Sequence, residues 1–453
     1  MSKIKSLILG SAAGFVAIAG AQAADLPVKA KAVQYVKICS LYGAGFYYIP
    51  GTETCIKLGG YVQADYNINA GNYNKPAWDE GGFRANGTGS RDSGYFTTRA
   101  RANFNIDTRT ATEYGVVRTY WSSNFEHSTG FVPSSGYLTL DYAFVQFAGF
   151  TLGKAVSGFQ TPWGAYGANN NTSYLLGGYD NATGITQIAY TWQFGNGVSA
   201  QIGLEDNRVI NRAQLLDTSV TLTAAQAVAA LGTGAYPNSY GGNVSPDIVG
   251  NIKVDQAAFT AQLSAAAHNI HSTYYALGAS AATVETNGHP SDTWGFAVQG
   301  GLQLKNLPTG PGDKLSLDAI YANGAMKYII GGVTGNNFDH FSGGNAVAYN
   351  TFADASLFDG IYGAGTSIEK TRGWGFRGAY VHNWTPNWET SLFGSYSKID
   401  YNAAASDMYC ARYATSVVAG LPRAQCNPDF AIWQIGSRTA WTPVQNLTFS
   451  GRT

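Results

Sequence analysis

The amino-acid sequence predicts an all-β fold, a transmembrane antiparallel up-and-down β-barrel, on three observations. Segments of about ten residues alternate between apolar and polar side chains along the chain. Short and long connections alternate between these segments. Charged residues make up only 12% of the 453 residues, against roughly 25% in soluble domains, whereas 56 glycines, 29 tyrosines and 10 tryptophans are present. This composition is typical of many strands and turns, and it excludes a disordered chain or a helical bundle.

The chain begins with the three parts of an export signal. Lys3 and Lys5 form a basic head, residues 7–20 form a short apolar run, and Ala21-Gln22-Ala23 fits an A-x-A cleavage site. A buried N-terminal helix is the alternative, but it does not require this layout. We therefore expect cleavage near Ala23 and export of the mature chain. No later apolar run approaches the roughly 18 residues of a helical membrane span.

The charges and cysteines fit an exported protein without a nucleic-acid partner. Without the two signal lysines the chain carries 26 basic and 28 acidic residues, a net charge of about −2, so nothing attracts nucleic acid electrostatically. The four cysteines fall as two sequence-local pairs. In an oxidising compartment we expect two disulfides. Cys39–Cys55 would join the segment before the first strand to that strand, and Cys410–Cys426 would lie within a surface loop. No C-x-x-C spacing points to structural zinc.

The stretch TTRARANFNIDT (97–108) shows the alternation clearly. Arg99 and Arg101 lie on one face with amides and a carboxylate, while Ala100 and Phe104 lie on the apolar face. The same pattern predicts strands at 55–68, 95–107, 112–124, 138–147, 150–155, 184–194, 197–205, 247–254, 258–268, 292–304, 313–323, 372–383, 388–400 and 431–441. A last, incomplete strand is expected to begin near Asn446.

The connections differ at the two ends of these strands. Short connections are predicted near 108–111, 148–149, 195–196, 255–257, 306–312, 384–387 and 442–445. Long connections are predicted at 69–94, 125–137, 156–183, 206–246, 269–291, 324–371 and 401–430. Their strict alternation indicates an antiparallel sheet with two unlike ends.

The apolar face of such strands is expected to face lipid. A membrane-spanning structure must satisfy its backbone hydrogen bonds internally, and a closed barrel does so. Arg99 and Arg101 then project into a water-filled lumen, because on the lipid side each would cost about 2–4 kcal/mol at mid-depth. A soluble sandwich with an apolar core predicts the same alternation. The low charge content and the tryptophans and tyrosines at strand ends count against it.

Several motifs carry a family resemblance. YVKICSLYGAGFYYIPGTETCIKLGGYVQADY (35–66), TRARANFNIDTRTATEYGVVRTY (98–120), DYAFVQFAGFTLGKAVSGF (141–159) and SPDIVGNIKVDQA (245–257) resemble the alphaproteobacterial, rhizobial-type outer-membrane porins. The resemblance extends to about Phe449. It implies a sixteen-stranded homotrimeric pore in the outer membrane of a Gram-negative bacterium, in contact with lipid and lipopolysaccharide. Small hydrophilic solutes and ions would diffuse through it passively, past a third extracellular loop that folds inward.

The resemblance also sets an expectation for the end of the barrel. Porins of this kind close with a final strand that pairs with the first and ends in an aromatic residue. Here about 14–15 strands are represented before Thr453, and single-chain barrels generally use even strand numbers. We expect a signal peptide (1–23), a pre-barrel segment (24–54) and a porin barrel (55–453) that is truncated at its C-terminus.

A diffusion pore needs a constriction whose size and charge select what passes. By register, the inward basic residues are Lys57, Arg99, Arg101, Lys154 and Arg377. Arg118 lies in YGVVRTYW, where the alternation is ambiguous, and is placed inward only because a charge in lipid is costly. Lys154 leads into the predicted constriction loop 156–183, whose only carboxylate is Asp180. Wall arginines opposite this carboxylate would create a transverse field. Each charge is otherwise a solvated lumen or loop residue, because alternation fixes its face but not its depth.

Aromatic residues are expected at the two membrane interfaces. An apolar ring with a polar edge suits the headgroup zone, and the candidates for such girdles are Trp192, Trp294, Trp374, Trp388 and Trp441. Together with Tyr190 and Phe296 they are alternatively a sugar-binding track.

Catalytic motifs are absent from the sequence. It has neither H-E-x-x-H nor G-x-S-x-G, and the glycines of a G-x-G-x-x-G at 373–378 lie within a predicted strand. His268 and His271 form a possible metal pair, but a loop surface explains them equally well. We expect no enzyme and no cofactor; calcium or lipopolysaccharide at the outer loops stays open.

Three function classes follow. The first is an outer-membrane porin for passive diffusion, with a non-conducting truncated porin as its variant. The second is a barrel that acts mainly in surface adhesion or interaction, with the long loops 206–246 and 324–371 as its working parts. The third is an outer-membrane hydrolase, for which no nucleophile–base pair is found. Single-channel conductance separates the first two, because an adhesin need not conduct.

Overall fold

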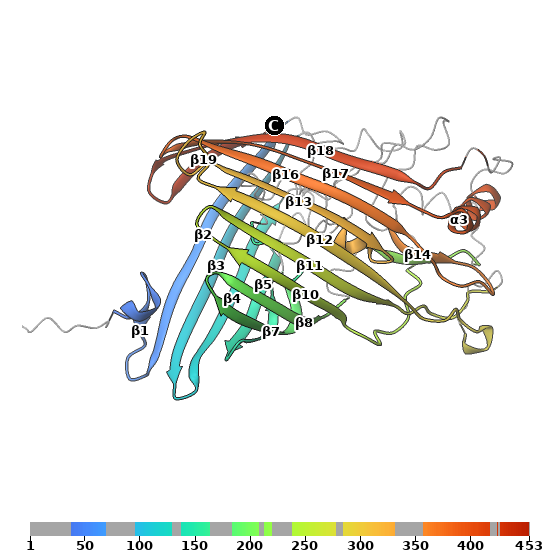
Figure 1. Cartoon of the computed structure of the whole chain (residues 1–453), viewed down its shortest axis with the longest axis horizontal. Coiled ribbons are helices and arrows are strands. Elements are labelled where there is room, and N and C mark those ends of the chain that lie inside the picture. Colours follow the sequence, from blue (N-terminus) through green and yellow to red (C-terminus); the bar gives the residue numbers. More distant parts are fainter. Residues whose placement is uncertain are drawn as a thin grey trace, which may run out of the picture.

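The computed structural model describes residues 38–68, 96–128, 137–163, 184–207, 213–219, 238–277, 284–330, 357–416, 424 and 426–452. Its main feature is one 16-stranded sheet in which strands pair antiparallel with their neighbours in chain order. The sheet curves round, so that its first strands pass behind its last ones (Figure 1). Within the described residues the order ends at β1 and β19, without a pairing that closes the sheet.

The strands of this sheet are β1 (Tyr47–Tyr48), β2 (Thr54–Ile68), β3 (Phe96–Thr112), β4 (Gly115–Ser128), β5 (Tyr137–Phe147), β6 (Phe150–Ala155), β7 (Ile185–Gly195), β8 (Val198–Glu205), β10 (Asp247–Asp255), β11 (Phe259–Ile270), β12 (Thr293–Lys305), β13 (Lys314–Asn323), β16 (Arg372–Thr385), β17 (Trp388–Asp400), β18 (Phe430–Val444) and β19 (Leu447–Arg452). The predicted antiparallel up-and-down sheet is therefore confirmed. β6 and β17 have the predicted bounds.

One predicted turn is wrong. Residues 108–111 lie inside β3, which continues to Thr112, and β4 begins only at Gly115. Thr112 pairs with Gly115, so two residues form the turn. Gly115 has a φ of 121°, which favours glycine, and this places the reversal here rather than earlier.

The two faces of the sheet differ as the alternation predicts. On β12, Trp294, Phe296 and Val298 are exposed, whereas Ala297 and Gln299 on the opposite face are buried. Because the exposed face is apolar, it suits a lipid environment better than water. We call it the outer face and the opposite one the inner face. No helix in the described part of the chain is both long and apolar enough to cross a membrane.

A second, smaller unit was not predicted. A three-stranded sheet is formed by β9 (Gln214–Asp217), β14 (Phe358–Tyr362) and β15 (Glu369–Lys370), and β9 and β14 run parallel. The 3₁₀-helices η1 (Ser40–Tyr42), η4 (Glu285–Asn287) and η5 (Met326–Tyr328) and the α-helix α3 (Ala403–Ser416) complete the described elements. The Asn402 side chain accepts a hydrogen bond from the Ala405 N–H at 2.8 Å, as a helix N-cap does.

A hydrophobic core lies on the inner face at the loop ends of the strands. Ile320 and Ala322 of β13 and Ile399 of β17 are buried there in one cluster with Met326 and Phe358. The expectation of a polar inner face is therefore wrong at this end. Its physical reason is that segments of the long connections fold inward and bury apolar side chains against the strands.

Both predicted disulfides are present. Cys39 bonds to Cys55 and Cys410 bonds to Cys426. The first joins the segment before β2 to that strand, as expected. The second is not within a plain surface loop, because Cys410 lies in α3 and is almost fully buried.

Candidate functional site

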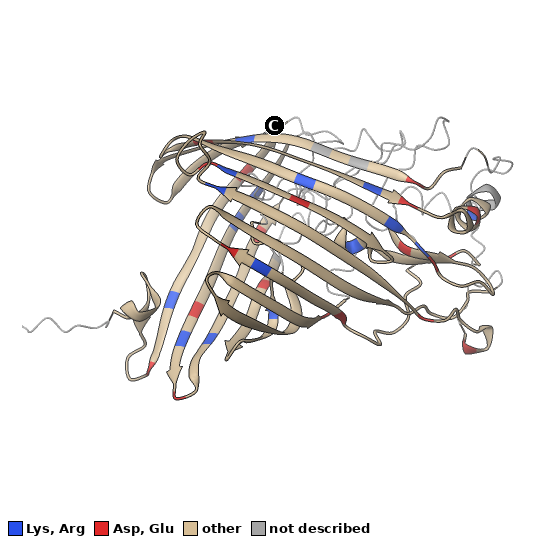
Figure 2. Ribbon diagram, in the orientation of Figure 1, with Lys and Arg blue, Asp and Glu red and all other residues tan. Residues whose placement is uncertain are grey.

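A ladder of ion pairs covers the inner face of β2, β3 and β4. Arg99 donates from Nε and Nη2 to Asp65 Oδ2 at 2.9 and 2.6 Å, and its Nη1 lies 3.6 Å from Glu126 Oε2. Basic and acidic residues are interspersed along these strands in Figure 2. Arg99 and Glu126 are almost fully buried. Because each charge in the ladder has an opposite charge beside it, the charges compensate each other.

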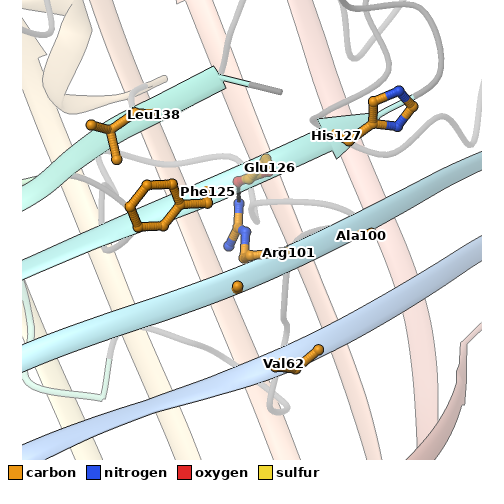
Figure 3. A pocket seen from close by; sticks show the side chains of 8 residues that line it. Val62, Ala100, Arg101, Phe125, Glu126, His127 and Leu138 are labelled. Atoms are coloured by element: carbon orange, nitrogen blue, oxygen red, sulfur yellow. Dashed lines mark ion pairs between the residues drawn. The ribbon is translucent and has the colours of Figure 1, made fainter. Parts of the chain in front are cut away.

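Arg101 continues the ladder. Its guanidinium pairs with the Glu126 carboxylate across β3 and β4, as the dashed line in Figure 3 marks. Both residues also border an open surface depression that Val62, Phe125 and Leu138 line. Those three side chains are exposed on the outer face. The ion pair therefore lies directly behind apolar outer side chains.

A second group of charges lies toward the short-turn ends of the same strands. Asp107 accepts hydrogen bonds from Arg109 at 2.8 Å and from Arg118 at 2.9 Å. Arg118 also donates to Gln146 at 2.9 Å, which places it on the inner face with Asp107. Lys57 is exposed, and its ammonium lies 5.8 Å from the centre of the Phe46 ring in the segment before β2.

The chain after β6 turns onto the inner face; we call residues 157–163 the inward segment. Lys154 of β6, shortly before this segment, is half-buried and donates to the Leu140 carbonyl. The Gly158 N–H donates to Glu205 Oε1 at 2.7 Å, and the Ser157 hydroxyl donates to Oε2 of the same carboxylate at 2.8 Å. Glu205 ends β8, so this strand fixes the base of the segment.

The inward segment then crosses the strands that follow. Asn251 of β10 donates to the Gly158 carbonyl at 2.6 Å, and Gln262 of β11 donates to the Gln160 carbonyl at 2.8 Å. A Cβ on Gly301 of β12 would lie 2.7 Å from both Thr161 and Trp163, so only glycine fits there. The segment thus lies flat against the wall.

The far end of the inward segment reaches a buried ion pair. The Arg377 Nε of β16 donates to both carboxylate oxygens of Asp318 on β13 at 2.8 Å, and both side chains are fully buried. The Thr161 hydroxyl lies 3.5 Å from Asp318 Oδ2. Trp163 packs against Ala379 and Phe393.

The structure thus brings together some of the predicted residues and not others. Arg99 and Arg101 share Glu126, and Arg377 meets the inward segment through Asp318. Lys57 and Arg118 lie elsewhere, near the turn ends. The predicted loop carboxylate, Asp180, and the loop beyond residue 163 lie outside the described residues.

The acidic partners of these arginines were missed from the sequence. The period-two register that places Arg99 inward also places Asp65 inward on β2, and the two residues pair directly. Glu126 faces Arg101 in the same way on β4. Opposite charges directly across a strand pair attract, so the acidic residues at these positions were a signal in the sequence for the partners of the arginines.

The predicted interface tryptophans are all partly exposed on the outer face, and they gather at the two ends of the strands. Trp388 and Trp441 stack 5.5 Å apart beside a short turn, and Trp192 lies 4.7 Å from Tyr190 at the same end. Trp294 and Trp374 lie near the long-connection ends of β12 and β16. Two bands on the outer face suit membrane interfaces.

The histidine expectation needs correction. His268 is not on a loop surface: it lies in β11, fully buried, and its Nδ1 is 2.7 Å from Asp247 Oδ1. In β11 every second residue is buried, and His268 belongs to this set. Its side chain therefore points to the inner face, where segments of the long connections cover it. His271 pairs instead with Asp292, so the two histidines have separate partners. The described residues contain no group of three or more His, Cys, Asp or Glu side chains that could hold a metal ion.

Comparison with known protein families places this geometry in context. A family model described as the porin subfamily matches residues 25–453. Porin Omp2b of Brucella suis is 37% identical over 211 residues, which are 45% of this chain and 52% of that protein. Porin Omp2b of Brucella canis is 38% identical over 213 residues, 45% of this chain and 54% of that protein. The chain thus matches about half the length of these relatives.

Comparison with solved structures supports the fold. The outer membrane channel DcaP of Acinetobacter baumannii covers 89% of this chain with a TM-score of 0.55, and 91% of that chain is covered. The sequence identity is 15%, so this likeness concerns the fold alone.

Proposed function

Because the chain belongs to the porin subfamily, we propose that it is an outer-membrane channel through which small hydrophilic solutes and ions diffuse passively. Membership of this subfamily favours a channel rather than an enzyme. The observation that carries the proposal is the contrast between the two faces of the sheet. Apolar side chains such as Leu263 and Ile252 are exposed outward, while amides, hydroxyls and paired charges lie inward.

Two chemically different walls line the proposed channel. β2 to β4 carry the arginine–carboxylate ladder, whereas the middle of β8 to β12 carries uncharged polar groups such as Gln201, Asn251 and Gln299. The inward segment lies against the second wall and narrows the space. Solutes would then pass between the inward segment and the charged ladder. Since the arginines are paired, selectivity among ions is expected to be weak.

The surroundings of the channel follow from the same proposal. The tryptophan bands would lie at the two interfaces of the outer membrane, in contact with lipid and lipopolysaccharide. We further propose a homotrimer, formed after export and cleavage of a signal peptide near Ala23. Residues 1–23, like the remainder of the first 37, lie outside the described residues.

Conductance distinguishes this proposal from a barrel that serves mainly in adhesion. β9 and β14, which belong to the two long segments expected to serve adhesion, contribute buried side chains to the core on the inner face. Purified protein in planar lipid bilayers should produce stepwise single-channel currents in potassium chloride. Folded, membrane-inserted protein that gives no such currents would refute the channel.

Removing the ladder arginines should alter ion selectivity. In the Arg99→Ala/Arg101→Ala variant, Asp65 and Glu126 lose their counter-charges, so the wall becomes more negative and favours cations. The reversal potential in a potassium chloride gradient should shift toward the potassium equilibrium potential. Arg109→Ala is a matched control, because Asp107 keeps its second partner. Equal reversal potentials in the double variant and the wild type would contradict the assignment.

A further inference from the structure

The segments that fold onto the inner face form a compact unit, which we call the mouth cap and define as residues 213–218, 325–330 and 357–362. Within it β9 and β14 pair in parallel, and η5 lies beside β14. Met326, Ile329 and Phe358 have at most 1% of their surface exposed. The mouth cap therefore packs on the loop ends of the strands as a folded body and not as a loose connection.

A buried ion pair fastens the mouth cap to the wall. Lys327 Nζ lies 2.5 Å from Asp247 Oδ2, at the start of β10. The Tyr328 hydroxyl donates to the same oxygen at 2.6 Å, and Asp247 Oδ1 lies 2.7 Å from His268 Nδ1 on β11. All four residues are buried. A lysine in this position needs its carboxylate, because an unpaired buried charge is strongly unfavourable.

The network continues to the second half of the mouth cap. His268 Nε2 lies 3.0 Å from the Tyr240 hydroxyl, which donates to Asp359 Oδ2 at 2.7 Å. Asp359 Oδ1 accepts the Met326 N–H at 2.6 Å. One buried network thus joins β10, β11 and both chain segments on either side of residues 331–356.

The two tyrosines remain neutral donors in this network. Burial raises the pKa of the Tyr328 hydroxyl well above its usual value, and the neighbouring Asp247 raises it further. Burial acts in the same way on the pKa of Tyr240, followed by Asp359. Each phenol therefore keeps its proton to donate to a carboxylate, and hydrogen bonds to charged acceptors are among the stronger ones.

The mouth cap also touches the base of the inward segment. The Phe159 ring lies 4.5 Å from the Tyr328 ring, and both side chains belong to the same buried cluster. Tyr328 therefore has two contacts at once: its hydroxyl meets the wall and its ring meets the inward segment. Gly158, which precedes Phe159, donates its N–H to the buried carboxylate of Glu205.

We propose that Lys327 and Tyr328 are positioning residues that latch the mouth cap to the inner wall and, through Phe159, set the position of the inward segment. The inference rests on the proposed channel function. The width of the channel then depends on residues that touch no solute. Loosening the latch releases the mouth cap and the base of the inward segment together.

Hydrogen–deuterium exchange tests the latch without any need for conduction. The variants are Tyr328→Phe, which keeps the ring against Phe159, and Lys327→Met, with Lys305→Met as a matched control. Lys305 pairs with Asp255 at the short-turn ends of β12 and β10, whereas the mouth cap lies at the opposite, loop ends of the strands. Peptides from 325–330, 357–362 and 157–163 should exchange at least about tenfold faster in both latch variants and unchanged in the control.

Single-channel recording supplies the second readout. Both latch variants should show more frequent current fluctuations and a broader spread of conductance than the wild type and Lys305→Met. Unchanged exchange in all three peptides, or faster exchange in the mouth cap without any in 157–163, would overturn the proposal. Should the wild type fail to conduct, the channel function fails, while the exchange result still decides whether the latch exists.

Discussion

Replacing Arg377 by methionine is expected to destabilise the protein by about 3–5 kcal/mol. Arg377 and Asp318 are both fully buried and bonded through two contacts of 2.8 Å. Methionine fills part of the space but leaves the Asp318 carboxylate without its counter-charge. The free energy of unfolding in urea, followed by tryptophan fluorescence in lipid vesicles, measures this loss.

A double variant separates the lost pair from a general packing defect. Arg377→Met/Asp318→Leu removes both charges, and about 2 kcal/mol or more of the loss should return, because replacing a whole buried pair by apolar groups is often neutral. Arg438→Met is a second comparison, since its partner Glu389 is partly exposed. If Arg377→Met unfolds at the same urea concentration as the wild type, the pair is not desolvated as described.

A cation on the outer face should be costly where one on the inner face is not. Ile252 is 57% exposed on the outer face of β10, and its neighbour Lys253 points to the inner face. Ile252→Arg should lower the free energy of unfolding by about 2–4 kcal/mol if the site lies at mid-depth in lipid. Lys253→Arg keeps an inward charge and should change it by less than about 0.5 kcal/mol.

The same urea titration in vesicles measures both variants, and the adjacent positions make depth nearly equal. In a water-soluble sandwich, Ile252 would face either water or a protein core. The loss of unfolding free energy expected for an arginine in lipid would then not apply to Ile252→Arg. Equal stabilities of the two variants would argue against lipid on the outer face. A larger loss for Lys253→Arg would reverse the assignment of the faces.

The sequence predicted the large sheet closely, because exposure to different media on two faces produces strong alternation. In GITQIAYTWQF (184–194) apolar rings and Ile188 alternate with Gln187, Ala189, Thr191 and Gln193, and all of this stretch but its first residue lies in β7. β14 has no such signal, since all five of its residues are buried and its sequence, FDGIY, does not alternate. A short strand that is buried on both faces has no alternation of polar and apolar residues, so its sequence resembles that of a loop.

The α3 helix was missed for a different reason. Its sequence, AAASDMYCARYATS, is rich in alanine, and Asn402 is a suitable cap. The helix lies within the predicted long connection 401–430, where no helix was expected. The helix is also fixed by contacts that the sequence does not show, such as the one between Tyr409 and Phe358.

The candidate site was predicted in part. Register identified the inward position of Arg99, Arg101 and Arg377, and the same register would have given Asp65. The pairing of β10 with β11 also places Asp247 opposite His268, next to the Ile248–Ala267 pair, but register did not give Tyr240 or Asp359, which reach His268 from the long connections. Those contacts depend on how the long connections fold, which alternation does not encode.

Chemical labelling of one inner and one outer cysteine during current recording tests the central claim most directly. All four native cysteines are paired, so Gln303→Cys and Leu302→Cys each add a single thiol on opposite faces of β12. A positively charged, water-soluble thiol reagent should lower the current through Gln303→Cys and leave Leu302→Cys unchanged. Modification of Leu302→Cys with no effect at Gln303→Cys would contradict a sheet whose polar face lines water and whose apolar face meets lipid.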